Sequence, residues 1–376
     1  MKTKTKTKSD IICAVFVAFI FIFALLFIIL PKKDFSETEK RYLAKRPEFS
    51  LEALGSGKFA SDTEKYLADH IPLRGFLVGV DSYYELLRGN NGSDGIYMGG
   101  DGWLIEKPFD RDNRFETNIA RITSFTEKTG VPAALAIVPE KGFVYADKLP
   151  KNALPYEDGK YLGRAAELCG ERVQFINLSE PFAAAWNEKQ LFYRTDHHWT
   201  SEGAYIAYTE ICKAFGQSAV SASDFTAETT SGFYGTSWST SLYTLTKPDD
   251  ITVMRSVKSG GAANVVIEDG GTTAADNMFF DEALEGYDKY TVFLDGNHPL
   301  VRIETGNPGE KLLIVKDSFA HCLAPFLAEN FSEIVMIDLR YYRKPISELI
   351  GGEGFDRVLF VYGMENIAES RDIILR

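Results

Sequence analysis

The chain has 376 residues, of which 45% are hydrophobic and 25% charged. This composition provides ample apolar material for a packed core and argues against wholesale disorder. The formal net charge is −12, and such an acidic surface repels phosphate backbones, which argues against a nucleic acid as partner.

The first element in chain order is an apolar segment at residues 11–30, with no charged, amide or hydroxyl side chain. A helix of about 20 residues spans roughly 30 Å, the thickness of a bilayer core. The run is longer than that of a cleavable signal peptide and ends in Pro31 and two lysines rather than in a small-x-small site. We expect an uncleaved single-pass anchor. Four lysines within residues 1–10 favour a cytoplasmic tail, although the two lysines on the far side weaken that preference.

The segment after the anchor, residues 31–57, is polar and charged and predicts a tether. Helical spacing over residues 58–88, interrupted at Pro72, predicts two amphipathic helices. Residues 95–106 place a glycine-rich turn between short apolar runs, as in a hairpin. We expect residues 58–376 to form one domain outside the cytoplasm.

Beyond the hairpin, apolar runs alternate with helical patterns, which predicts an α/β fold whose parallel sheet is covered by helices on both faces. The interval 217–289 is rich in Ser, Thr, Gly and acidic residues and predicts an insertion with some strand content. The predicted helices lie at 115–125, 161–170 and 203–216, and the predicted strands at 133–139, 173–178, 291–296, 311–316, 333–338 and 357–363.

The cysteines beyond the anchor are Cys169, Cys212 and Cys322, each in an apolar stretch and none in a CxxC pair. They predict small buried side chains rather than a zinc site.

The first cluster of reactive side chains lies at residues 193–200, YRTDHHWT, directly before a predicted helix. If the segment is extended, Asp196 and His198 share a face and His197 points the other way. An aspartate beside a histidine can fix the imidazole tautomer and stabilise the imidazolium, as a general base requires. The alternative interpretation is a capped helix start with hydrogen-bonded histidines.

The second cluster is IVKDSFA, where the predicted strand 311–316 gives way to a helix. Ser318 therefore lies at the carboxyl end of a parallel strand, where nucleophiles gather in open α/β sheets. The helix N-terminus offers N–H groups for an oxyanion. The alternative role of Ser318 is that of a helix cap.

Together TDHHWT and KLLIVKDSFA, with the upstream runs FSETEKRYLAKRPEFS and GIYMGGDGWL, resemble the bacterial DHHW protein family. That family is related to SGNH-hydrolase-like proteins of the AlgX/AlgJ type, which are involved in polysaccharide O-acetylation. The resemblance covers residues 35–366 and implies an SGNH-hydrolase-like domain with a circularly permuted motif order. It also implies that Asp196 orients His198, the general base, and that Ser318 is the nucleophile. Lys316 stands where the family pattern has glycine.

Further side chains are candidates for oxyanion or substrate binding. Asn297 and His298 follow a predicted strand, Arg340 and Tyr341 follow another, and Asn366 follows the last, where the resemblance places an oxyanion asparagine. Turns or solvated loops are the alternatives. Trp199 adjoins the histidines, and the aromatics of segment 232–243 (Phe233, Tyr234, Trp238 and Tyr243) suit either a glycan platform or a hairpin core.

The sequence and the resemblance favour a serine-dependent O-acetyltransferase or acetylesterase that acts on cell-envelope or secreted polysaccharide. From the resemblance, a transferase implies an MBOAT-type membrane acyltransferase as partner. One alternative is a metal-dependent hydrolase that uses Asp196, His197, His198 and His298, although no third ligand has convincing spacing. The other is a catalytically silent glycan-binding or scaffold protein. We predict no cofactor and no metal site.

Overall fold

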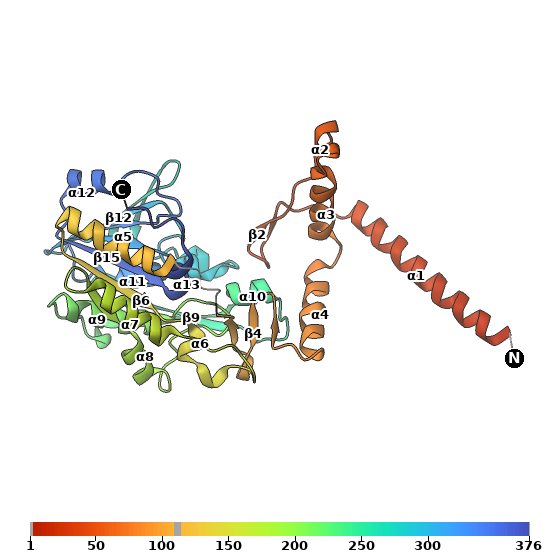
Figure 1. Ribbon diagram of the computed structural model, residues 1–376, viewed down its shortest axis with the longest axis horizontal. Coiled ribbons are helices and arrows are strands. Elements are labelled where there is room, and N and C mark those ends of the chain that lie inside the picture. Colours follow the sequence, from red (N-terminus) through yellow and green to blue (C-terminus); the bar gives the residue numbers. More distant parts are fainter. Residues whose placement is uncertain (1–2, 109–113, 376) are drawn as a thin grey trace. The chain divides into compact units, whose positions relative to one another are not determined.

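The computed structural model describes residues 3–108 and 114–375 (Figure 1). The chain divides into two compact units. The first comprises Met1–Asn90 with Ser239–Leu245, and the second comprises Asn91–Trp238 with Thr246–Arg376. The start of the sheet-bearing unit thus lies at residue 91 rather than at the expected residue 58.

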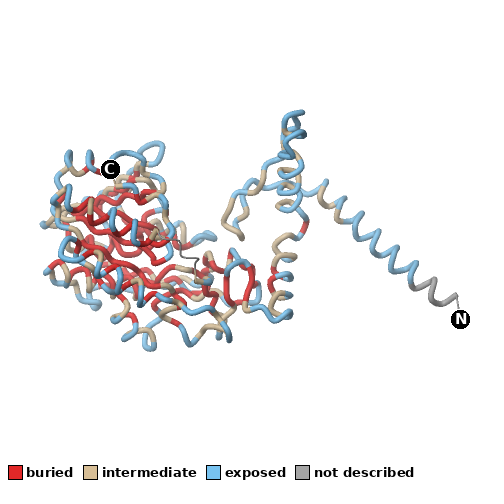
Figure 2. The backbone as a smooth tube through the Cα atoms, in the orientation of Figure 1, coloured by how far each residue is buried: buried red, intermediate tan, exposed pale blue. Residues whose placement is uncertain are grey.

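The first unit begins with a long apolar helix, α1 (Thr3–Ile29). Its segment Ser9–Ile29 has a mean hydropathy of 3.4 and is long and apolar enough to cross a membrane. None of that segment is buried, as the pale-blue tube in Figure 2 shows. This agrees with a single-pass anchor. Part of the predicted tail, at residues 1–2, lies outside the described residues.

Residues 31–57, expected as a tether, carry local structure: strands β1 (Phe35–Ser36) and β2 (Arg41–Tyr42) and helix α2 (Leu51–Gly55). The Arg41 guanidinium lies 2.6 Å from a carboxylate oxygen of Asp69, and such charge-assisted bonds hold the segment on the next helices. Those are α3 (Lys58–His70) and α4 (Arg74–Leu87), the two predicted helices separated at Pro72.

Residues 239–245 join the first unit because they pack on α4. The Ser82 hydroxyl donates to the Ser241 carbonyl at 2.5 Å, and the Leu245 N–H donates to the Tyr83 hydroxyl at 2.9 Å. Gly79 permits the close approach, since a Cβ there would lie 2.9 Å from the Leu242 carbonyl oxygen. A turn in the middle of the predicted insertion is therefore part of the N-terminal unit.

The second unit is built on an eight-stranded sheet with the order β11-β10-β12-β14-β13-β15-β6-β7. Strands β14, β13, β15, β6 and β7 are parallel, whereas β12, β10 and β11 run antiparallel at one edge. The sheet is mixed, not wholly parallel as predicted. The strand bounds are β6 (Ala133–Val138), β7 (Gln174–Asn177), β10 (Ala262–Glu268), β11 (Thr272–Asn277), β12 (Leu300–Glu304), β13 (Lys311–Lys316), β14 (Glu333–Ile337) and β15 (Arg357–Gly363).

Helices cover both faces, as predicted. Alternate residues of β13 separate two cores: Leu313 and Val315 lie in one cluster, and Leu312 and Ile314 lie in the other. The first cluster includes side chains of α5 (Arg114–Thr129), α7 (Asp158–Cys169), α12 (Ile346–Glu353) and α13 (Met364–Glu369). The second includes side chains of α8 (Ser179–Ala185), α9 (Ser201–Ala214) and α11 (Phe319–Leu327). Cys169, Cys212 and Cys322 are buried and unpaired, as predicted.

Smaller elements complete this unit: α6 (Lys141–Val144), a three-stranded sheet of β3 (Gly92–Ser93), β4 (Ile96–Met98) and β5 (Leu104–Glu106), and the pair β8 (Phe225–Phe233) and β9 (Asp249–Ser256). The hairpin predicted at 95–106 is β4–β5. The predicted insertion supplies β8 to β11, and β10 and β11 extend the main sheet. Helix α10 (Thr236–Ser241) lies between β8 and β9.

The prediction of a strand at residues 291–296 is wrong. Residues Lys289–Val292 form a 3₁₀ turn, and the strand of this region is β12. Leu294 and Asp295 have φ values of 58° and 57°, in the left-handed region that interrupts an extended chain. Apolar content suggested a strand, but the following Asp-Gly-Asn turn determines the backbone.

Candidate active site

Ser318 lies between β13 and α11, at the carboxyl end of a strand in the parallel part of the sheet. This is the crevice side on which α/β sheets place reactive groups. The serine is 7% exposed. Asp317, just before it, ties the turn down: its carboxylate accepts from the Gly363 N–H at 2.7 Å and from the Phe319 N–H at 3.0 Å.

Asp196 and His198 lie in a tight loop closed by a bridge between Phe192 and Trp199. The loop is held at its entry by the buried Asp249, which accepts from the N–H of Thr195 at 2.8 Å. At its exit Thr200 accepts from the Gly203 N–H at 3.3 Å and caps α9. This segment therefore caps α9 through Thr200 and also carries the side chains of Asp196 and His198, so the two interpretations do not exclude each other.

The loop and the turn bring three side chains into one hydrogen-bonded chain. His198 Nε2 lies 2.7 Å from Ser318 Oγ, and His198 Nδ1 lies 2.6 Å from Asp196 Oδ1. The second Asp196 oxygen accepts from the Thr236 N–H at 2.7 Å. With its proton on Nδ1, a neutral His198 donates to Asp196 and accepts from the serine hydroxyl, which is the arrangement of a nucleophile and its base.

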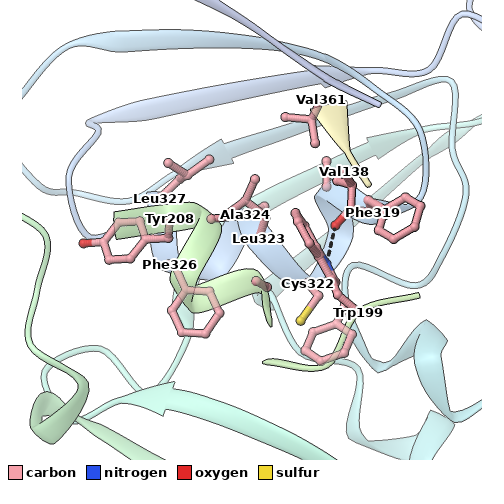
Figure 3. Close-up of a cluster of buried hydrophobic side chains, with 14 of the residues drawn as sticks. Val138, Trp199, Tyr208, Phe319, Cys322, Leu323, Ala324, Phe326, Leu327 and Val361 are labelled. Atoms are coloured by element: carbon pink, nitrogen blue, oxygen red, sulfur yellow. Dashed lines mark hydrogen bonds between the residues drawn. The ribbon is translucent and has the colours of Figure 1, made fainter. Parts of the chain in front are cut away.

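Aromatic rings enclose the imidazole. Tyr290 stacks on His198 with ring centroids 4.0 Å apart and an interplanar angle of 11°, and Phe319 packs at 5.3 Å. Trp199 is fully buried, and its indole N–H donates to the Phe319 carbonyl at 3.1 Å (Figure 3). Trp199, a candidate for substrate contact, thus braces the start of α11. No sequence signal indicated Tyr290, because its segment carries no motif.

Lys316, which stands where the resembled family pattern has glycine, is buried at the end of β13, two residues before Ser318. Its Nζ lies 2.6 Å from His321 Nε2 on α11 and 3.4 Å from Asp338 Oδ2. Burial lowers the pKa of Lys316 to about 8. Asp338 also accepts from the Arg340 guanidinium at 2.6 Å, so the ammonium belongs to a charge network that links β13, α11 and the end of β14.

The remaining candidates lie around this network. The Asn366 amide donates to Asp317 at 2.8 Å and so helps to hold the turn that carries Ser318. Arg340 donates to Asn297 at 3.0 Å, and its guanidinium lies 5.4 Å from the ring of Tyr341. His298 pairs with Asp269 and with the Asp295 carbonyl. Within the described residues, none of Asn297, His298, Arg340, Tyr341 and Asn366 forms a hydrogen bond with Asp196, His198 or Ser318.

The aromatic residues of segment 232–243 fall into two groups, one in the core and one partly exposed near Asp196. Phe233 and Tyr243 are buried and belong to the packing. Tyr234 and Trp238 are half-buried and pair with ring centroids 4.3 Å apart. Thr236, between them, hydrogen-bonds to Asp196, so this aromatic pair flanks the residue that fixes the aspartate.

The prediction that His197 points away from the other two side chains is wrong. Its ring centroid lies 3.8 Å from that of His198, because residues 194–198 form successive bends rather than a strand. Its Nδ1 hydrogen-bonds to the Thr236 hydroxyl. Desolvation in the loop, with a contribution from His198, lowers the pKa of His197 to about 4 although 36% of its side chain is exposed, and this histidine is neutral at pH 7.

We expect His197→Ala to reduce stability more than turnover, because the side chain supports the loop through Thr236. Loss of that hydrogen bond should lower the free energy of unfolding by about 0.5–1.5 kcal/mol. Denaturant unfolding and turnover of a small acetyl ester measure the two effects. His198→Ala is the matched comparison and should show the reverse pattern. Equal losses of turnover in both variants would contradict this assignment.

The metal-site alternative depends on Asp196, His197 and His198, whose possible ligand atoms lie within 4.8 Å of one another. Both ring nitrogens of His198 and both oxygens of Asp196 already have hydrogen-bond partners. His298, the proposed further ligand, pairs elsewhere. The donor arrangement therefore suits proton transfer better than coordination.

Sequence reasoning missed Lys141, whose side chain is 1% exposed. Its Nζ donates to the Asp196 carbonyl at 2.7 Å and lies 3.4 Å from both the Ser237 hydroxyl and Glu106 Oε2. A lysine two residues beyond a buried strand was the available signal, but nothing in the sequence linked it to the distant histidine loop. The ammonium fixes the backbone that carries Asp196.

We expect Lys141→Met to lower kcat by about 10- to 100-fold with little change in KM, because small displacements of catalytic groups are costly. Steady-state kinetics on a small acetyl ester measure the split. Glu106→Gln is the control: it keeps the bond from Lys141 to the Asp196 carbonyl and should cost less. A proportional loss of folded protein, with normal kcat in what remains, would show that the lysine serves stability alone.

Comparisons with known proteins agree with this architecture. Residues 96–238 match the family profile described as SGNH hydrolase-like domain, acetyltransferase AlgX, and residues 176–337 match the profile described as DHHW protein. The Pseudomonas syringae protein named probable alginate O-acetylase AlgJ is 29% identical over 174 residues, which are 44% of this chain and 44% of that protein. The match therefore spans less than half the length of this curated relative.

Two solved structures share the fold. A DHHW family protein from Eubacterium siraeum has a TM-score of 0.65 at 23% identity, covering 74% of this chain and 94% of that one. Bacillus cereus PatB1, solved with a sulfonyl adduct, has a TM-score of 0.66 at 22% identity, covering 76% and 100%. The chain thus shares the mixed α/β fold of these two proteins.

Proposed function

We propose that this chain, a relative of the DHHW and AlgX/AlgJ-type proteins, is a serine-dependent O-acetyltransferase or acetylesterase. It acts outside the cytoplasm on cell-envelope or secreted polysaccharide and is anchored through α1. The observation that carries the proposal is the hydrogen-bonded chain Ser318–His198–Asp196, with its 2.7 and 2.6 Å contacts. The names of the relatives support acetyl groups and polysaccharide as the chemistry.

In the first half-reaction Ser318 Oγ attacks the carbonyl carbon of an acyl donor while His198 Nε2 takes the hydroxyl proton. Asp196 stabilises the imidazolium that forms. The tetrahedral intermediate then collapses: the donor's leaving oxygen takes the proton from His198, and the acyl group remains on Ser318. The amino end of α11 begins at the serine and provides a partial positive charge near the developing oxyanion.

In the second half-reaction His198 removes the proton of a sugar hydroxyl, whose oxygen attacks the acyl-serine. Collapse of that intermediate releases the sugar ester, and the proton returns to Ser318 Oγ. With water in place of the sugar, the same steps hydrolyse the ester. The low exposure of Ser318 and His198, 7% and 6%, favours transfer because it restricts water.

A transferase on the far side of the membrane needs a source of acyl groups. We propose an MBOAT-type acyltransferase as the partner that delivers them across the bilayer, since acyl donors are made in the cytoplasm. The half-buried pair Tyr234 and Trp238 beside Thr236 is a candidate platform for the sugar rings.

Mass spectrometry of the purified full-length protein, incubated with a small acetyl ester, tests the proposal. We expect a mass increase of one acetyl group on the peptide that contains Ser318, lost on addition of an acetyl-accepting polysaccharide oligomer. Acetylated oligomer indicates transfer, and free acetate alone indicates hydrolysis. Absence of the adduct, together with no labelling of Ser318 by a fluorophosphonate, would favour a catalytically silent binding protein.

The proposed orientation predicts that a reporter fused after Arg376 is active only outside the cytoplasm. The apolar segment Ser9–Ile29 and the lysines before it motivate this topology. Alkaline phosphatase and a fluorescent protein that matures only in the cytoplasm, fused at the same residue, report opposite sides. A strong cytoplasmic signal would overturn the localisation and with it the proposed substrate class.

A further inference from the structure

An open pocket of about 390 Å³ lies in the first unit, formed by residues 44–48 and one face of α3. Its lining carries four cationic side chains against two carboxylates. The cationic residues are Lys45, Arg46, Lys58 and Lys65, and the acidic ones are Glu48 and Asp62. We call it the basic pocket. In a chain of net charge −12, this local excess of positive charge selects anionic ligands.

The pocket is a built feature rather than a chance gap between side chains. The Ala44 N–H donates to Asp69 at 2.8 Å, and the Ala44 carbonyl lies 2.9 Å from His70 Nε2. Both bonds fix the segment that carries Lys45 and Arg46 to the end of α3. Within the pocket Lys58 pairs with Asp62 at 2.6 Å, which leaves Lys45, Arg46 and Lys65 against Glu48.

The end of the apolar helix lies beside the same helix α3. Phe27, in the last turns of α1, packs edge-on against Tyr66 with ring centroids 6.1 Å apart. Tyr66 directly follows Lys65 of the basic pocket. Tyrosines favour the membrane–water interface, where the ring is in the apolar layer and the hydroxyl is wet. If α1 spans the bilayer, this contact places α3 at headgroup level.

Exposed apolar side chains adjoin the pocket. Phe49, Leu51 and Leu54 are 67%, 80% and 53% exposed, and Phe49 packs edge-on against Phe59 of α3. Ser50 caps α2 by accepting from the Ala53 N–H at 3.0 Å, so these side chains belong to an ordered turn. Apolar groups next to lysines and arginines are typical of segments that lie in a membrane interface.

We propose that the basic pocket binds the headgroup of an anionic phospholipid in the membrane that α1 spans, with Phe49, Leu51 and Leu54 entering the interface. The phosphodiester meets the lysines and the arginine, and the acyl chains continue toward the bilayer beside α1. The inference rests on the proposed anchoring but is independent of the proposed chemistry at Ser318. The first unit then recognises anionic lipid in addition to anchoring the chain in the membrane.

The test uses the full-length protein in phosphatidylcholine nanodiscs, with Cys13→Ser and a fluorophore on Ser56→Cys, two residues before Lys58 of the pocket. Spin-labelled phosphatidylglycerol or spin-labelled phosphatidylcholine is titrated as quencher. We expect half-maximal quenching at a mole fraction about tenfold lower for phosphatidylglycerol, because each basic side chain near the surface favours anionic lipid. The preference should vanish in the pocket variant K45Q/R46Q/K58Q/K65Q.

A matched control removes four exposed lysines of the second unit, K128Q/K151Q/K160Q/K213Q, and should keep the preference. Loss of the preference in the control as well would reduce the effect to net charge and overturn the proposal. Displacement of the phosphatidylglycerol by soluble polyuronate oligomers would do the same, because the pocket would then serve the polymer. A chain that fails to enter nanodiscs would overturn the anchoring too, whereas acetyl-ester turnover reports on Ser318 separately.

Discussion

If the proposed function is right, Ser318→Ala is expected to abolish turnover of a small acetyl ester, with a fall in kcat of at least about 10⁴-fold, as removal of the nucleophile does in Ser–His–Asp enzymes. The hydroxyl lies 2.7 Å from His198 Nε2, and no acyl-enzyme can form without it. The fold should be retained, because Ser318 makes no side-chain cap bond to α11 and Asp317 holds the turn.

Two measurements make this result decisive. Labelling by a fluorophosphonate should disappear in the variant. It should remain in Ser221→Ala, which alters an exposed serine far from Ser318 in the sequence. The unfolding transition should stay close to that of the natural chain. Residual turnover within about tenfold of normal, in a folded variant, would exclude Ser318 as the nucleophile.

Asp196→Asn is expected to lower kcat by about 10⁴-fold while Ser318 stays in place. Asp196 Oδ1 accepts from both the backbone N–H and Nδ1 of His198, and Oδ2 accepts from the Thr236 N–H. In either orientation an asparagine places its NH₂ group against a backbone donor, the Thr236 N–H or the His198 N–H. With the oxygen on the Thr236 side, the NH₂ group also faces the imidazole. Nδ1 must then be the acceptor, the proton moves to Nε2, and the base can no longer take the serine proton.

Asp250→Asn provides the matched control, since it makes the same change at an exposed position in β9. Its turnover should equal that of the natural chain. Because the altered tautomer affects the base rather than binding, KM should move little in Asp196→Asn. A large rise in KM with an unchanged kcat would assign Asp196 to substrate binding instead.

The sequence contains enough to place the reactive side chains on their elements. KLLIVK is an apolar run that ends in Asp-Ser, and TDHHWT stands directly before an amphipathic helix. Each pattern is local, so hydrophobic periodicity and capping reveal it. The parallel strands β6, β13, β14 and β15 are predictable for the same reason, since each is a short and mostly buried run.

What the sequence could not supply is the meeting of distant segments. Lys141, Asp196 and Thr236 come together only because the order of strands and the path of the loops bring them to one edge of the sheet. The stacking of Tyr290 on His198 depends on a 3₁₀ turn. The apolar run 291–296 instead predicted a strand in this region. The antiparallel strands β10 and β11, in the insertion expected to have some strand content, could not be assigned to the main sheet because they are rich in small and polar residues.

Because residues 239–245 belong to the N-terminal unit, the chain passes between the two units more than once. The chain enters the second unit at residue 91, leaves it after Trp238 and re-enters it at Thr246, so three peptide crossings join the units. After a proteolytic cut at residue 90, residues 1–90 would no longer be covalently linked to the rest of the chain and would be held through the packing of α4 on residues 239–245. Trimming the chain to residue 91 would strip Leu242 and Tyr243 of the α4 surface that covers them, so a minimal soluble fragment should retain α4.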